Sequence, residues 1–202
     1  MKFPAHLICF AFFFTIPLFL FGQNPSLSVA DPEVQIKMAL LPAPKDKKEN
    51  AKVYGYNQKG DFVVLREGSN DMICLASDPS SEKLHVACYF AELEPFMARG
   101  RKLIQEGITG KERDEIRGKE IESGELMMPK GISTLFVYDA DEGDFNPETG
   151  EVEKGRLRSV LYVPYLTGEE SGLPTKPVGP GIPWLMDAGT HKAHIMITPA
   201  NP

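Results

Sequence analysis

The sequence contains little cysteine, histidine or tryptophan, with 3, 4 and 1 of these residues in a chain of 202. No two cysteines show the C-x-x-C spacing of a redox motif, and no H-E-x-x-H pattern marks a zinc protease. A nucleophile elbow, a phosphate-binding loop, a dinucleotide fingerprint and internal repeats are missing as well. These absences exclude the enzyme classes that such motifs identify and leave other enzymes open.

Basic residues are also in short supply, with 22 lysines and arginines against 28 aspartates and glutamates, for a formal net charge of −6. Nucleic acids and anionic membranes are bound through a basic footprint, so we expect neither as a partner. Beyond residue 21 no second apolar stretch reaches the roughly 20 residues that span a bilayer. We therefore expect no membrane insertion once the N-terminal segment has been removed.

The N-terminal segment has the pattern of a secretory signal. Lys2 precedes an apolar run from residue 7 to residue 21, which is typical of a secretory h-region. We expect residues 1–30 to be a signal peptide with a short spacer, cleaved between residues 22 and 30. Residues 31–202 then form a single domain that is exported to the periplasm or the cell exterior.

The rest of the chain predicts an α+β fold. Asp31 followed by Pro32 predicts a helix start. Residues that favour strands alternate with turn signals over residues 51–57, 61–67, 72–77 and 84–90, which predicts a four-strand antiparallel meander. A charged helical region follows at 91–126, and later strands are expected at 133–140, 157–165 and 194–200. We thus expect one antiparallel sheet, the meander plus later strands, with helices packed on one side.

The third hairpin of the meander predicts a disulfide. If Asp78 and Leu84 close this hairpin, the numbers of facing residues sum to 162, and Cys74 faces Cys88. Facing side chains in an antiparallel pair can be close enough to bridge. An oxidising compartment favours a structural disulfide between them, and the alternative is two buried free thiols.

The segment GTHKAHIMI places His191 and His194 three residues apart, where a loop leads into the last strand. Zinc takes three or four ligands, so the pair predicts a metal site only if a distant carboxylate completes it. Such a site would make the protein a metal-assisted hydrolase with a divalent cation. The alternative is two structural, hydrogen-bonded histidines, and no other cofactor is predicted.

Three stretches carry a resemblance to a family: VVLREGSNDMICLASDP, VACYFAELEPFMARGRKL and PWLMDAGTHKAHIMI. Together they resemble a family of exported bacterial proteins of uncharacterised function, over residues 33–200. In such relatives a glycine is expected where this chain has Asp71. The resemblance implies export and a single domain, and it implies no activity, cofactor or site residue.

The sequence favours a soluble exported domain that binds a small molecule or an envelope protein without catalysis. The hypothesised ligand site brings the REGSN segment, with Arg66, Glu67 and Asn70, to Trp184 and His194. It requires the end of the second predicted strand to lie beside the last strand.

Two alternatives stay open at this point. One is the hydrolase described above. The other is an envelope-associated interaction protein, which would dock through the charged helix predicted within residues 108–126. A Pro- and Gly-rich loop over residues 166–183 fits any of these functions, because loops of that length are often functional or mobile.

Overall fold

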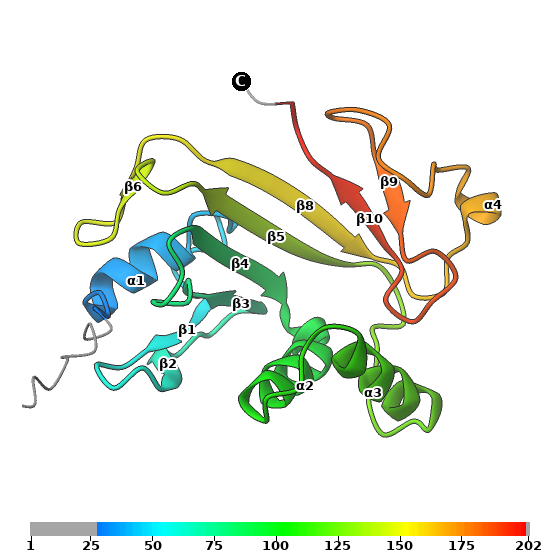
Figure 1. Ribbon diagram of the computed structural model, residues 1–202, viewed down its shortest axis with the longest axis horizontal. Helices are drawn as coiled ribbons and strands as arrows, with labels where there is room; N and C mark the ends of the chain where they lie inside the picture. Colours follow the sequence, from blue (N-terminus) through cyan, green and yellow to red (C-terminus); the bar gives the residue numbers. More distant parts are fainter. Residues whose placement is uncertain (1–27, 201–202) are drawn as a thin grey trace, which may run out of the picture.

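The computed structural model describes residues 28–200, and its main element is a twisted sheet of eight strands with helices on both faces (Figure 1). The predicted signal peptide, up to residue 27, lies outside the described residues. No helix in the described part is long and apolar enough to cross a membrane.

The strands of the large sheet are arranged in the order β2-β1-β3-β4-β5-β8-β10-β9. Their bounds are β1 Lys52–Tyr56, β2 Phe62–Arg66, β3 Met72–Leu75, β4 Leu84–Phe90, β5 Ser133–Ala140, β8 Arg156–Tyr162, β9 Trp184–Met186 and β10 His194–Ile197. A separate two-stranded ribbon pairs β6 Phe145–Asn146 with β7 Glu151–Val152. The helices are α1 Pro32–Ala39, α2 Glu94–Gln105, α3 Gly110–Glu122 and the short α4 Gly168–Ser171.

The predicted α+β content and the mostly antiparallel sheet are confirmed, but the four-strand meander is wrong in its order. β3 pairs with β1 in parallel, so β2 lies at the outer edge and not between them. The chain crosses the start of β1 at Gly68, where a Cβ would collide with the backbone of Lys52. The backbone N–H groups of Ser69 and Asn70 donate to the carbonyl of Asn50 at the same crossing. A short connection therefore spans one strand, because β2 ends where β1 and β3 begin.

The predicted hairpin register and the disulfide are confirmed. Cys74 faces Cys88 in the antiparallel pair of β3 and β4, with their Cα atoms 4.1 Å apart, and the two sulfur atoms are bonded. Both cysteines are fully buried, beside Ala39 of α1 and Val53 of β1. The bridge thus forms part of the core between α1 and the sheet.

The prediction that the helices pack on one side is wrong, because they cover both faces. Alternation along β4 sends Leu84, Val86 and Cys88 toward α1, where Met38 and Ala39 bury them. Tyr89 points the other way and packs with residues of the segment that leads into α2 and of α2 itself, namely Leu93 and Met97. The sheet is therefore the middle layer, with α1 on one face and α2 and α3 on the other (Figure 1).

Candidate functional site

Two large hollows lie on opposite faces of β4. Leu84 lines a hollow of about 630 Å³ on the α1 face, which we name the N-terminal pocket. His85, Ala87 and Tyr89 line one of about 420 Å³ on the other face, which we name the helix-side groove. The same short strand thus contributes to both, because successive side chains of a strand point to opposite faces.

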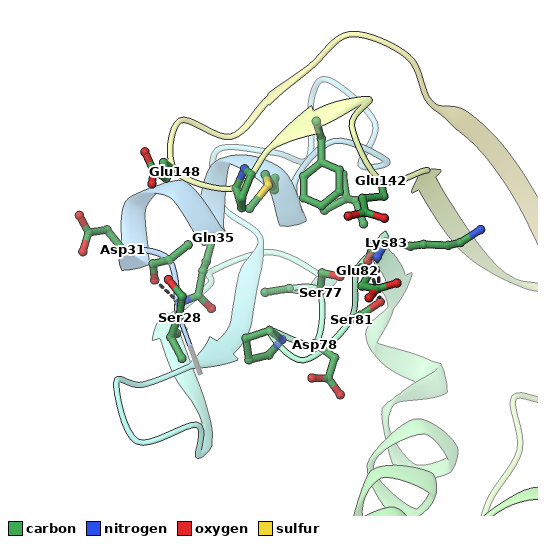
Figure 2. A pocket seen from close by; sticks show the side chains of 18 of the residues that line it. Ser28, Asp31, Gln35, Ser77, Asp78, Ser81, Glu82, Lys83, Glu142 and Glu148 are labelled. Atoms are coloured by element: carbon green, nitrogen blue, oxygen red, sulfur yellow. Dashed lines mark hydrogen bonds between the residues drawn. The ribbon is translucent and has the colours of Figure 1, made fainter. Parts of the chain in front are cut away.

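The N-terminal pocket lies between the segment that leads into α1, the β3–β4 loop and the β5–β6 loop (Figure 2). Its lining is acidic, with one basic residue, Lys83, and the carboxylates Asp31, Asp78, Glu82, Glu142 and Glu148. Figure 2 shows the carboxylates of Asp31, Asp78 and Glu148 pointing away from the hollow and from one another. They do not converge on a point where a cation could be held.

The polar interior of this pocket is already satisfied. The Gln35 side chain is buried, its Nε2 donates to the carbonyls of Ala30 and Tyr56 at 2.7 and 2.9 Å, and its Oε1 accepts from the Tyr56 N–H at 2.9 Å. None of the enclosed, unpartnered side-chain atoms found in residues 28–200 belongs to its lining. The pocket is roomy, but its described lining has no enclosed polar side-chain atom that lacks a partner.

The helix-side groove differs in charge and in chemistry. Its floor is apolar and comes from the sheet, through Leu75, Ala87, Leu135 and Val137. Its charged residues come from α2, α3 and the β9–β10 loop: Arg101, Arg113, Arg117, Lys192, Asp114 and Asp187. Four basic against two acidic residues give the groove a net charge of +2, in a chain whose net charge is −6.

Arg117 is the most unusual of these residues, because only 6% of its surface is exposed. Its guanidinium lies 3.9 Å from the centre of the Phe96 ring, and its Nη2 donates to Asp114 Oδ1 at 2.7 Å. Its Nε is enclosed and has no partner among the described residues. Burial lowers the pKa of Arg117, and the hydrogen bond to Asp114 only partly offsets it.

Arg113 lies one turn before Arg117 on α3, on the same side of the helix. Its Nε is likewise enclosed without a partner and lies 3.8 Å from Asp114 Oδ1, too far for a hydrogen bond. Arg101 is different, because its two terminal nitrogens donate to Tyr89 Oη and to Glu94. Among the arginines that line the groove, Arg113 and Arg117 of α3 are therefore the two whose Nε lacks an acceptor.

Asp114 connects α3 to the last part of the chain. Lys192 Nζ donates to Asp114 Oδ2 at 2.7 Å and lies 3.3 Å from Asp187 Oδ2. Burial acts to raise the pKa of Asp114, but the hydrogen bonds from Lys192 and Arg117 outweigh it, and the pKa is lowered. An ionised Asp114 thus holds the β9–β10 loop against the helix.

The structure places both predicted histidines on the groove side of the sheet. His194 Nδ1 donates to the Lys192 carbonyl at 2.7 Å, since a carbonyl can only accept, and His194 lines the groove. The ring of His191 packs edge-on against Phe96, 6.2 Å between centres, and against Gly118 of α3. Burial first, and then Arg117 and Lys192, lower the pKa of His191.

The metal prediction for His191 and His194 gains no third ligand. Within residues 28–200, no group of three or more His, Cys, Asp or Glu side chains could hold a metal ion. His191 Nε2 is enclosed without a hydrogen-bond partner, and His194 Nδ1 is engaged by the backbone. The metal-assisted hydrolase stays a prediction that these residues do not complete.

The structure does not bring Arg66, Glu67 and Asn70 to His194, because β2 lies at one end of the strand order and β10 beside β9 at the other. Arg66 donates to the carbonyls of Lys48 and Ala51, and Glu67 pairs with Lys52 at 3.1 Å. The Asn70 side chain donates to the Lys47 carbonyl and accepts from the Met72 N–H. These residues support the crossing over β1.

Trp184 does share a sheet face with His194. In the antiparallel pair of β9 and β10, Met196 faces Trp184 and His194 faces Met186, so all four side chains point to the groove side. Trp184 itself is outside the groove lining. The loop over residues 166–183 contains α4, whose start is stabilised by a capping box between Thr167 and Glu170. This loop does not line the groove either.

Sequence reasoning missed Arg113 and Arg117, because alternating charges on α3 predict a solvated helix. The available signal was the Arg117–Gly118 pair, since a glycine within a helix allows a close neighbour and here His191 lies against it. In comparisons with known proteins, no family model, no curated protein and no solved structure matches this chain. The candidate site therefore rests on its own geometry.

Proposed function

We propose that this protein is an exported binding protein that holds a small anionic ligand in the helix-side groove and does not catalyse a reaction. The observation that carries the proposal is the buried guanidinium of Arg117, with an enclosed Nε that has no partner among the described residues. It lines the groove next to Arg113, which is short of acceptors in the same way.

A buried cation is costly unless it is paired and its donors are satisfied. Asp114 does not provide acceptors for all the donors of the two arginines. It also accepts from Lys192, and it lies beyond hydrogen-bond distance of Arg113 Nε. An anionic ligand in the groove would pair with these guanidinium groups through charge-assisted hydrogen bonds, which are among the stronger ones in proteins. The groove is thus better matched to an anion than to water.

Binding is favoured over catalysis by the composition of the groove. Its lining includes no serine, threonine or cysteine, so the Ser- and Cys-type nucleophiles have no candidate there. In this proposal the rings of His194 and Tyr162, whose centres are 5.3 Å apart, form a wall of the site beside the cations. Export is supported by the disulfide, because disulfides persist in oxidising compartments.

The proposal is tested by thermal unfolding with a panel of anions (acetate, benzoate, decanoate and inorganic phosphate) at fixed ionic strength. A ligand at 100 times its Kd stabilises the folded state by about 2.7 kcal/mol, which raises Tm by several degrees. Arg113→Gln should abolish the shift. Arg156→Gln, an exposed arginine that pairs with Asp141 outside the groove, is the matched control and should keep it. The proposal fails if no anion shifts Tm, or if both variants respond like the natural protein.

A further inference from the structure

We infer that the ligand of the helix-side groove is an amphiphilic anion, with a single anionic head bound at α3 and an unbranched apolar body lying on the sheet. The inference rests on the proposed function and adds the class of ligand. It follows from the way in which charged and apolar side chains are separated along the groove.

The cationic end of the groove is built from α3 and the β9–β10 loop. Arg113, Arg117 and Lys192 line it, with His194 beside them. The ring of Phe96 lies under the guanidinium of Arg117 and 5.9 Å from the ring of Tyr162, so the head site has an aromatic wall. An anionic head here would meet two guanidinium groups with unused donors.

The other end of the groove is apolar and comes from different elements. Ala87 of β4 is paired with Val137 of the adjacent strand β5 and, on its other side, with Leu75 of β3. Met97 and Ile104 of α2 line the side of the groove, and Ile104 is 48% exposed. Arg101 of α2 also lines the groove, but its terminal nitrogens are engaged by Tyr89 Oη and Glu94. A free inorganic anion bound at α3 would therefore leave most of the groove uncovered.

The groove has a definite length. Tyr89 and His85 mark it along β4, four residues apart, which corresponds to about 13 Å at roughly 3.3 Å per residue. At the far end His85 Nδ1 lies 2.6 Å from Asp139, which also accepts from Arg158 at 2.7 Å. This polar group ends the apolar floor. The apolar body of the ligand is therefore limited to about the length of the groove.

Two small residues, Gly100 and Ala87, line the groove. A Cβ at Gly100, on the groove side of α2, would lie 3.0 Å from Arg117 Nη1, so a larger residue would push the guanidinium away from the groove wall. Ala87 is the smallest side chain of the floor. Met97 can adapt to different chains, because its side chain is flexible and polarizable.

The test is isothermal titration calorimetry of the mature protein with straight-chain carboxylates from acetate to tetradecanoate, kept below their micelle concentrations. Each CH₂ that enters the groove should tighten Kd by about two- to fourfold. The gain should stop once the chain exceeds the groove length. Decanol, which has no charge, should bind about tenfold or more weakly than decanoate, and decyltrimethylammonium should not bind.

Two matched variants locate the apolar body. Ile104→Gln places an amide at the groove edge and should weaken decanoate several-fold while leaving acetate unchanged. Leu157→Gln is the control, because Leu157 is 42% exposed and faces Tyr138, on the other side of the sheet. It should change neither ligand.

The outcomes separate this inference from the proposed function. If acetate and phosphate bind with Arg113-dependent affinity and chain length adds nothing, the groove is a plain anion site and the amphiphile is wrong. If decanol binds as tightly as decanoate, the anionic head is wrong, and the proposed function fails with it. If no member of the series binds, both are overturned.

Discussion

Strand β4 presents different kinds of side chain to the two faces of the sheet. On the α1 face, Leu84, Val86 and Cys88 are at most 1% exposed and contact other apolar groups. On the α2–α3 face, His85 is exposed, and Tyr89 is buried but donates to Glu94 at 2.5 Å. The first face contributes apolar burial, and the second also holds hydrogen-bonded polar groups.

The helices contact these faces through different residues. On the α1 face the contact includes Ala39, which has no side chain beyond Cβ and is fully buried. On the other face Phe96 and Arg117 stand between the helices and the sheet. A hollow lies on each face, but arginines line only the one on the α2–α3 face.

The largest difference in stability between the two faces is expected when neighbouring residues of β4 are replaced one at a time. Leu84→Ala is expected to lower the free energy of unfolding by about 2–5 kcal/mol, because it removes most of an apolar side chain that is only 1% exposed. His85→Ala should change it by about 0.5 kcal/mol or less, since the His85 side chain is 61% exposed. Urea unfolding of both variants measures the difference, and equal losses would mean that the faces do not differ in packing.

The disulfide belongs to the α1 face and should stabilise it. The double variant Cys74→Ala, Cys88→Ala opens a loop with a sequence separation of 14. Loop-closure entropy predicts a loss of about 3 kcal/mol. Denaturant unfolding gives this value. Intact mass after alkylation without reductant checks the bond itself, and labelling of both thiols would contradict it.

The polar core of the α2–α3 face should be sensitive to a single hydroxyl. Tyr89→Phe removes the group that donates to Glu94 and accepts from Arg101, and it should cost about 1–1.5 kcal/mol although it makes the core more apolar. Tyr138→Phe is the control on the α1 face, where the hydroxyl has no hydrogen bond to the described residues. A loss below about 0.5 kcal/mol in both variants would remove this distinction.

The smallest effect concerns pH, and it also belongs to the groove side. Burial beside Arg117 and Lys192 lowers the pKa of His191 from its ordinary 6.5, so the unfolded chain binds its proton more tightly. The stabilisation that neutral His191 allows is present above pH 6.5 and is lost as the pH falls toward the lowered folded-state pKa. His191→Asn should flatten this part of the stability profile, measured by urea unfolding between about pH 4 and pH 8. An unchanged slope would show that His191 titrates alike in both states.

Local patterns in the sequence predicted a good part of the fold. The start of α1 at Pro32, the ends of β4 and the end of α2 before Gly107 depend on neighbouring residues, and Gly107 takes the positive φ of +81° that favours glycine. The register that pairs Cys74 with Cys88 follows from one short hairpin. Such features are predictable because they involve few residues that are close in the chain.

The candidate site was harder to predict, for a physical reason. His194, predicted as a ligand or metal contact, lines the helix-side groove, but its expected companion Arg66 supports the crossing over β1. The arginines near His194 come from α3, whose residues are more than 70 positions earlier, and the ion pair of Lys192 with Asp114 joins residues 78 positions apart. A charge pattern alone does not distinguish a solvated arginine from one that a distant loop buries.

The sequence by itself determined the alternation of β4, the disulfide register and the helix ends, because each depends on the geometry of a few consecutive residues. Only the tertiary structure decided that β3 pairs with β1, that α1 lies opposite α2 and α3, and that Arg117 is buried beside Phe96. These features depend on which distant surfaces exclude water together. That selection depends on packing of the whole chain, and it placed the groove where no local motif pointed.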